Sequence, residues 1–541
     1  MFDWSSSRKT RNKLSSRRIA AFVVVLLAFG VAVAQQPPAA PPSSSRPPSS
    51  DSTSKDQVTP PKNPATPGAN SAEHLVTPEE AKELFRSVDR ILKFASRETE
   101  LPVRQEVKRE LVSRDHMESY VNHRVDEDED VQRMQRSERV LKKFGLLPRG
   151  FDMRGFFVKL LREQVAGYYD PKTKTVNLLN WVQPAVQEPV LAHELTHALQ
   201  DQSFDLERWL KHGVTAETKP PASGPSPKPD SKDKSSKDNQ QDNASEVQSD
   251  EEEAARLAVV EGQAMLVLVD YMLAPTGQSV VNSPGVVDAI KKGMMVGDNS
   301  PVFNSSPLYL KESLTFAYRY GLDFERELLS KKGKEAAFAG VFRRPPQSER
   351  EIMEPAAYMS DEHLPALTVP NFDAILHDSY EKFDVGSFGE FDVSVLVEQF
   401  GGSEASDQLT PGWRGGYYYA AQPKGKSNGP LAIVYVSRWA SAEGAQEFAD
   451  VYATSLEKRY RRVNPVRAPQ KLIAISYPAK HRSGAQDEDD DDEPTTTEWM
   501  TDEGRIIIEP HGDLVLAIES FDQRSADKLR EAVLSADKPQ R

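Results

Sequence analysis

The feature that most constrains this chain is the His-Glu-x-x-His run at residues 193–197, inside the apolar, helix-like stretch Val190–Asp205. Successive residues of an α-helix turn by about 100°, so side chains four positions apart lie on one face. His193 and His197 can therefore hold a single zinc ion. Glu194 lies about 100° round the helix from His193, which suits a base acting on metal-activated water better than a third ligand.

The pattern alone is weak evidence for a zinc site, because about one or two shuffled chains in a hundred would contain it by chance. The residues around it must therefore also fit a helix. Pro189 fits the first turn of a helix, and apolar residues recur through the following ten positions. The alternative is that two histidines and a glutamate lie on an ordinary half-exposed helix. A second feature of the sequence argues against that alternative.

The second feature is the stretch Ala254–Leu273, which is apolar nearly all round and is typical of a buried helix. Glu261 stands in its middle, and a lone buried carboxylate is costly unless it is paired or binds a metal. Two histidines leave zinc one protein ligand short, and Glu261 can supply it. Gly262 and Ala264 would let another backbone or the metal site approach closely. Pairing of Glu261 with a buried Arg or Lys is the alternative.

Two histidines on one helix and a glutamate on a later helix resemble the gluzincin branch of the zincin metallopeptidases. Residues 165–200 and 254–266 also resemble a little-characterised group of exported bacterial proteins assigned as metallopeptidases, and the resemblance covers most of residues 76–541. The metzincin branch does not match, because it has a Gly and a third His where this chain has Gln200 and Ser203. Two further segments of the resemblance are residues 313–324 and 344–358.

The resemblance implies that His193, His197 and Glu261 are zinc ligands and that Glu194 is the general base. In well-known gluzincins an Asp often follows the ligand Glu by four residues and orients a ligand His. This chain has Met265 at that place, so the orienting group is unassigned.

The N-terminus has the three parts of a secretory signal peptide. Residues 1–18 carry six basic residues, an apolar run follows over Ile19–Ala34, and the run ends in Ala32-Val33-Ala34. We expect cleavage after Ala34 and export into the periplasm, the cell envelope or the medium. The run is short for a full membrane span. An uncleaved signal anchor is the alternative, and it would be the protein's only membrane attachment.

Composition divides the rest of the chain. Cysteine is absent, which excludes disulfides, thiolate ligands and a cysteine-linked lipid anchor. Residues 35–75 are rich in Pro and Ser and read as a disordered linker. Residues 76–383 are expected to form the gluzincin-like domain, mainly helical with a small antiparallel sheet. Within it, residues 213–253 read as a disordered insertion, whose removal brings Glu261 within about two dozen positions of His197.

Aromatic residues near the motif are candidates for substrate binding. Residues 164–180 read as a β-hairpin that contains Tyr168 and Tyr169. An exposed edge of such a hairpin can hold a peptide by strand addition, although the hairpin can equally serve only to pack under the helix. Tyr318 and Tyr320 are candidates to stabilise an oxyanion, against the alternative that they are core or rim tyrosines. His363 and His377 are further candidates of the same kind.

From residue 384 to residue 541 strands alternate with two helices, which predicts an α+β sandwich domain. No catalytic cluster is visible there, so we expect a structural or substrate-binding role. An acidic loop at 484–494 lacks the spaced ligands of a calcium loop. The net charge of −14 and the lack of a basic stripe with aromatics exclude nucleic acid as a partner. Strands are predicted at 417–421, 431–437, 472–476, 495–500, 505–509 and 514–520, and helices at 442–458 and 523–534.

These observations predict an exported zinc-dependent metallopeptidase that acts on proteins or peptides, with Zn²⁺ activating water and Glu194 as general base. The alternative is a non-catalytic envelope binding or assembly protein that retains a zinc site. Glu194 argues against that alternative, since a structural zinc needs no base. Structural sites also usually have four protein ligands, and three are visible here.

Overall fold

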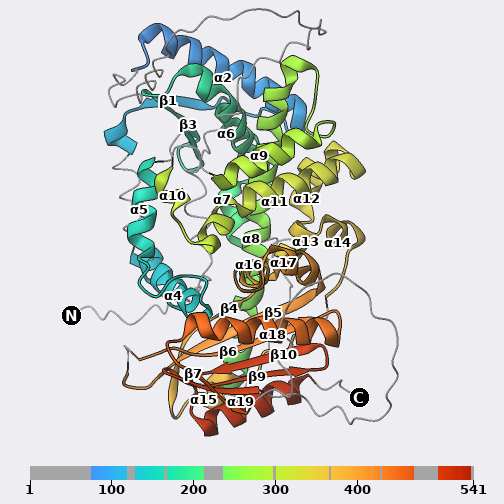
Figure 1. Cartoon of the computed structure of the whole chain (residues 1–541). Helices are drawn as coiled ribbons and strands as arrows, with labels where there is room; N and C mark the ends of the chain where they lie inside the picture. The colour runs from blue at the N-terminus through green and yellow to red at the C-terminus, as the bar shows by residue number, and fades with distance from the viewer. Residues whose placement is uncertain are drawn as a thin grey trace, which may run out of the picture.

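The structure is a computed structural model, which describes residues 75–117, 128–163, 167–212, 235–296, 300–364, 367–426, 429–467 and 497–537. In these ranges helices dominate and two sheets are present, so the chain has the predicted α+β fold (Figure 1). Several predicted segments lie outside the described residues: the signal peptide, nearly all of the Pro-rich linker, residues 213–234, the strand at 472–476 and the acidic loop.

The first part of the described chain is mainly helical, as predicted. Its elements in chain order are α2 (Pro78–Thr99), β1 (Lys108–Val112), α4 (Asp128–Phe144), α5 (Met153–Glu163), β2 (Tyr168–Asp170), β3 (Thr175–Leu179), α6 (Pro184–Phe204), α7 (Leu206–His212), α8 (Ser235–Leu273), the 3-10 helix η1 (Ala274–Thr276), α9 (Pro284–Val296), α10 (Pro301–Asn304), α11 (Leu308–Lys332), the π-helix η2 (Glu335–Gly340), α12 (Val341–Arg343), α13 (Glu349–Met353) and α14 (Pro355–Ser360).

The small sheet has the strand order β1-β3-β2. β2 and β3 form the predicted antiparallel hairpin, with Tyr169 opposite Val176. β1 pairs with β3 in parallel, so the sheet is mixed rather than antiparallel. The physical reason is the long connection that contains α4 and α5, because a crossover can bring two strands together in parallel where a tight turn cannot.

α6 carries the His-Glu-x-x-His run and begins earlier than expected, at Pro184. Pro189 therefore lies inside the helix, where its ring removes one backbone hydrogen bond, rather than in the first turn. The buried Gln187 ties the helix to β3. Its Oε1 accepts from the Leu179 N–H at 3.0 Å, and its Nε2 donates to the Leu179 carbonyl at 2.9 Å.

α8 is a single helix of 39 residues and about 58 Å that runs from beside α6 to the second sheet (Figure 1). It begins at Ser235, so the prediction of disorder is wrong for residues 235–253. The polar composition misled because the acidic side chains at the end of that segment accept backbone N–H groups: Asp250 Oδ2 from Ser387 at 3.2 Å, and Glu251 Oε2 from Glu349 at 3.0 Å. Residues 250–276 are long and apolar enough to cross a membrane, but most are buried inside the protein, as in a core helix.

α8 and α11 cross in close contact at a pair of glycines. A Cβ added to Gly262 would lie 2.3 Å from the backbone of Gly321, and a Cβ added to Gly321 would lie 2.2 Å from the Ala258 carbonyl oxygen. The predicted close approach of another backbone at Gly262 is therefore present. The crossing places the middle of α11 against the C-terminal half of α8, where Glu261 lies.

The C-terminal part of the chain forms the second sheet and its helices. Its elements are α15 (Phe372–Leu376), β4 (Tyr380–Ser387), α16 (Glu390–Gly401), α17 (Ser403–Leu409), the 3-10 helix η3 (Thr410–Gly412), β5 (Trp413–Pro423), β6 (Ala432–Trp439), α18 (Ala442–Arg459), β7 (Val463–Arg467), β8 (Thr497–Thr501), β9 (Gly504–His511), β10 (Leu514–Glu519) and α19 (Gln523–Ala536).

This sheet has seven antiparallel strands in the order β4-β5-β6-β10-β9-β8-β7. Successive side chains of β6 face opposite sides. Val434 belongs to the core shared with Leu529 of α19, whereas Tyr435 packs against Phe448 of α18 with ring centroids 5.9 Å apart. α15 and α19 cover one face, and α16 and α18 cover the other, which gives the predicted layered α+β arrangement.

The two predicted regions share one hydrophobic core. At the end of α4, the Phe144 ring centroid lies 4.4 Å from that of Phe388 and 5.7 Å from that of Tyr435. One cluster of buried apolar residues extends from Leu84 in α2 to Ala517 in β10. The predicted border at residue 384 falls inside β4 and marks a change in secondary structure rather than a gap between cores.

Candidate metal centre

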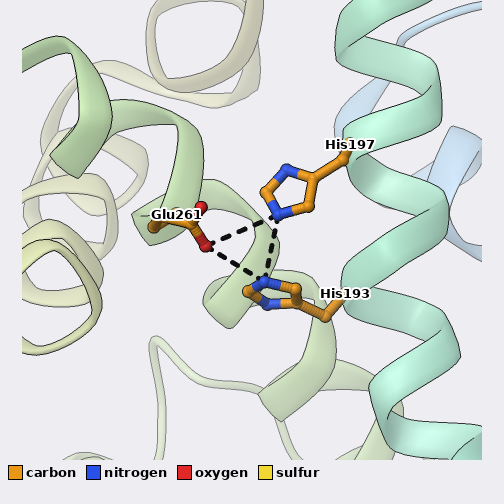
Figure 2. Close-up of side chains that lie close together, drawn as sticks. All are labelled: His193, His197 and Glu261. Carbon is orange, nitrogen blue, oxygen red and sulfur yellow. Dashed lines mark hydrogen bonds and ion pairs between the residues drawn. The ribbon is translucent and has the colours of Figure 1, made fainter. Parts of the chain in front are cut away.

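Three side chains from α6 and α8 point toward one another (Figure 2). The Nε2 atoms of His193 and His197 lie 3.0 Å apart, and Glu261 Oε2 lies 3.1 Å from the first and 3.4 Å from the second. In a tetrahedral zinc site with bonds of about 2.0–2.1 Å, ligand atoms lie about 3.3–3.4 Å apart. The structure thus brings together the three predicted ligands with a spacing that suits one metal ion. In the part of the chain that the structure describes, no other three His, Asp or Glu side chains bring their ligand atoms close enough together to share one metal ion.

Glu261 is 3% exposed. Within the described residues its partners are the imidazoles of His193 and His197 and the Tyr318 hydroxyl, and not the Arg or Lys of the alternative. Burial raises the pKa of Glu261, but His197 and His193 outweigh that effect and lower the pKa to about 2. Burial likewise lowers the pKa of His197, and the Glu261 carboxylate outweighs it, raising the pKa to about 9. Without a metal, the centre is therefore a buried imidazolium–carboxylate pair at neutral pH.

Glu194 is buried beside the ligands and is held by the hairpin. Its Oε2 accepts a hydrogen bond from the Tyr169 backbone N–H at 2.7 Å. Burial raises the pKa of Glu194, while the nearby charges of His193 and His197 act in the opposite direction. The hairpin thus positions Glu194, because the Tyr169 N–H of β2 points away from β3 and orients this carboxyl group.

The two hairpin tyrosines are buried in the core. The Tyr169 hydroxyl donates to Asp201 Oδ2 at 2.7 Å, and Lys174 Nζ donates to the same oxygen at 2.6 Å. Tyr168 packs in the cluster that includes α6. Substrate binding by Tyr168 and Tyr169 stays a prediction. What the structure gives Tyr169 is a positioning contact with Glu194 through its main chain.

His197 is oriented by a residue that we did not assign from the sequence, Gln200. Gln200 Oε1 lies 2.9 Å from His197 Nδ1, and Gln200 Nε2 donates to the Val260 carbonyl at 3.0 Å and to Gln263 Oε1 at 2.9 Å. Because the amide nitrogen is committed, the amide oxygen faces the imidazole, and Nδ1 must carry the proton. The Nε2 lone pair of neutral His197 is then available to a metal.

The same amide network continues to α11 and η2. Gln263 Nε2 donates to the Ala337 carbonyl at 2.7 Å and to the Phe338 carbonyl at 3.2 Å. Glu325, which is fully buried beside Gln263, has its pKa raised well above the ordinary value by burial. It was also missed from the sequence. The expected orienting position, Met265, is instead a buried core residue.

Tyr318 is the tyrosine of α11 that reaches the centre. Its ring stacks on His193 with centroids 6.0 Å apart, and its hydroxyl bonds Glu261. Burial, and then the charges of Glu261 and Glu194, raise the Tyr318 pKa well above its usual value. His193 Nδ1 has no hydrogen-bond partner within the described residues, so the ring is positioned by the stacking on Tyr318 and by the contacts of Nε2 with Glu261 and His197. The hydroxyl of Tyr318 is therefore one of the groups that contact the predicted ligands.

The remaining candidates lie elsewhere. The Tyr320 ring packs on Phe316, with centroids 5.2 Å apart, and near the Arg319 guanidinium. His363 and His377 have exposed side chains that face the nearby carboxylates of Asp361 and Asp378. None of these three residues joins the centre.

Comparison with known proteins reaches only the other end of the molecule. A family model described as a domain of unknown function (DUF8575) matches residues 380–530. That span runs from β4 into α19 and so corresponds to the seven-stranded sheet with its helices. No curated protein and no solved structure matches the chain. The candidate centre on α6 and α8 lies outside the matched residues.

Proposed function

We propose that this chain is an exported zinc metallopeptidase that hydrolyses peptide bonds in proteins or peptides. The observation that carries the proposal is the convergence of two imidazole nitrogens and one carboxylate oxygen, 3.0–3.4 Å apart, next to a buried glutamate. Two histidines and one glutamate are a donor set typical of catalytic zinc, which keeps one position open. The signal-like N-terminus supports export.

A zinc ion bound there supplies a Lewis acid and an activated water at neutral pH. Glu194 is the proposed proton carrier between water and the leaving amine. Burial raises its pKa toward the working pH, which strengthens it as a base, and the Tyr169 N–H fixes its direction. Tyr318 is the proposed donor to the developing oxyanion, since its hydroxyl reaches the ligand Glu261 and its ring stacks on His193.

The substitution Glu194→Gln tests this proposal. Loss of a general base typically lowers turnover by about 10²–10⁴-fold, while the three ligands stay in place. We therefore expect one zinc per chain in both wild type and variant, with turnover of a diverse peptide library lost only in the variant. Glu188→Gln is the matched control, because Glu188 lies on the same helix but pairs with the exposed Arg90.

Two outcomes would contradict parts of the proposal. Full activity in Glu194→Gln would show that another residue is the base. Zinc-loaded wild type that cleaves nothing in the library would favour the alternative, a non-catalytic envelope protein with a retained zinc site.

A further inference from the structure

Two fully buried amides, Gln200 of α6 and Gln263 of α8, connect His197 to the π-helix η2. His197 Nδ1 lies 2.9 Å from Gln200 Oε1, and Gln200 Nε2 donates to Gln263 Oε1 at 2.9 Å. Gln263 Nε2 then donates to the carbonyls of Ala337 and Phe338 in η2, at 2.7 and 3.2 Å. The two amides therefore form a relay that begins at an imidazole and ends on main-chain atoms.

The direction of every bond in this relay is decided at η2. A backbone carbonyl can only accept, so the two η2 carbonyls require the nitrogen of the Gln263 amide and turn its oxygen toward Gln200. That oxygen requires the nitrogen of Gln200, whose own oxygen is left for the His197 Nδ1–H. Reversal of either amide would place oxygen against oxygen in a buried site, which is costly. The Nε2 lone pair of His197 is thus directed from a helix that carries no predicted ligand.

The same amides tie together the helices that carry the ligands. Gln200 Nε2 also donates at 3.0 Å to the carbonyl of Val260, the residue before Glu261. The relay therefore joins α6 to α8 beside the third predicted ligand, and Gln263 joins α8 to η2. π-helical segments are rare and frequently accompany functional sites. η2 fits that pattern, because two of its successive carbonyls bond the amide that leads to His197.

We propose that Gln263 is a positioning residue for the metal centre: the η2 backbone, acting through Gln263 and Gln200, determines which ring nitrogen of His197 binds the metal. The inference rests on the metal site of the proposed function, but the relay can be measured with and without metal. Partners of a ligand histidine change metal affinity by about 10–100-fold, and Gln263 stands one bond further out, so we expect it to contribute about three- to tenfold.

The matched pair Gln263→Met and Gln187→Met tests the proposal in the full chain. Both glutamines are buried, and each accepts one hydrogen bond and donates two, but Gln187 bonds Leu179 and Val182 instead of the relay. We expect similar losses of unfolding free energy in the two variants, with zinc affinity about three- to tenfold weaker only in Gln263→Met. Equal zinc affinity in the two variants would reduce Gln263 to a structural residue and overturn the proposal.

A double variant shows whether Gln263 acts through Gln200. In a Gln200→Leu background the relay is already cut, so Gln263→Met should weaken zinc binding no further. Residues that act independently would instead show effects that multiply. Multiplied effects would therefore overturn the route from η2 through Gln200.

The ring proton of His197 gives a readout that needs no zinc. NMR with isotope-labelled histidine should show a His197 Nδ1–H that exchanges slowly with water, because the proton is buried against Gln200 Oε1. Gln263→Met should speed this exchange about five- to tenfold, as for the loss of one hydrogen bond, and Gln187→Met should leave it unchanged.

Wild type alone also tests the relay, so the proposal stands or falls even if a variant fails to fold. Zinc bound through Nδ1 of His197, or a wild-type Nδ1–H that exchanges as fast as that of an exposed histidine, would overturn it. Slow exchange in a wild-type chain that binds no zinc would support the relay and contradict only the proposed function.

Discussion

Two buried glutamates, Glu261 and Glu519, show what distinguishes a candidate site from a structural cluster. Both are nearly inaccessible, at 3% and 0% exposure, and both have a pKa below the ordinary value. Burial alone therefore does not separate them.

The partners separate them. Glu519 receives two bonds from Arg459, at 2.8 and 2.7 Å, and a hydroxyl bond from each of Tyr452 and Tyr460, with Lys143 at 3.8 Å. Arg459 and the two tyrosines donate hydrogen bonds and Lys143 adds a positive charge, so the carboxylate is saturated. Glu261 instead meets two imidazoles whose Nε2 atoms also face each other. Nitrogen lone pairs and carboxylate oxygens that point at one place suit a shared cation, whereas a ring of donors suits only the carboxylate.

The largest effect expected from this comparison is on zinc affinity. Glu261→Gln replaces the one anionic ligand of the three by a neutral amide and should weaken zinc binding by about a hundredfold to a thousandfold. Competition with a fluorescent chelator measures it. Glu390→Gln is the matched control, since it changes another buried carboxyl group, one that bonds Arg350 rather than the centre. Equal zinc affinity in wild type and Glu261→Gln would remove Glu261 from the ligand set.

At Glu519 we expect the opposite pattern, a loss of stability with no loss of zinc. Glu519→Gln leaves the buried Arg459 without its anion and should lower the free energy of unfolding by about 3–5 kcal/mol. Urea unfolding measures the loss, and zinc content of the folded protein should stay at one per chain. Glu509→Gln should cost less, because the partner Arg530 has a side chain 41% exposed. Zinc loss in Glu519→Gln would break the distinction between the two clusters.

The orienting amide gives a smaller effect. Gln200→Leu removes the acceptor for His197 Nδ1 and should weaken zinc binding by about 10–100-fold. Gln202→Leu on the same helix is the control, since Gln202 bonds the main chain near residue 104 instead. Affinities that are indistinguishable in the two variants would contradict a role for Gln200 in orienting His197.

The smallest expected effect is the change in apparent zinc affinity for each pH unit. The pKa of metal-free His197 is about 9, so zinc must displace one proton below that pH. Apparent affinity should rise about tenfold per pH unit up to about pH 9 and then level off. The same shift stabilises the metal-free protein fully below pH 6.5, the ordinary histidine value, and this stabilisation is lost as pH rises through about 9. An affinity that is flat between pH 7 and pH 9 would contradict the pairing of His197 with Glu261.

Local periodicity accounts for what the sequence predicted well. The helical spacing of His193 and His197, and the isolated carboxylate of Glu261, are visible without any knowledge of tertiary structure. Gln200 was within reach, because it follows His197 by three residues on the same helical face. The sequence named both Tyr318 and Tyr320, and which of the two reaches the centre depends on the Gly262–Gly321 crossing, which no local pattern reveals.

The missed strands have a similar explanation. β4 contains Glu381, Lys382 and Asp384, whose charges hide a strand that is buried at its second half. Asp384 is accommodated by the Tyr418 hydroxyl at 2.9 Å. β7 contains Pro465, which suits its place at the edge of the sheet and argues against a strand in the sequence.

The long helix α8 has a consequence for how the protein is made. Asp250 accepts the N–H of Ser387, which is 137 residues further along the chain. A ribosome adds about 5–20 residues per second, so the acidic half of α8 waits on the order of ten seconds for β4 to emerge. Its charged, low-complexity composition keeps that half in water during the delay. The residues that resemble a disordered insertion are thus suited to a helix whose second binding partner is synthesised late.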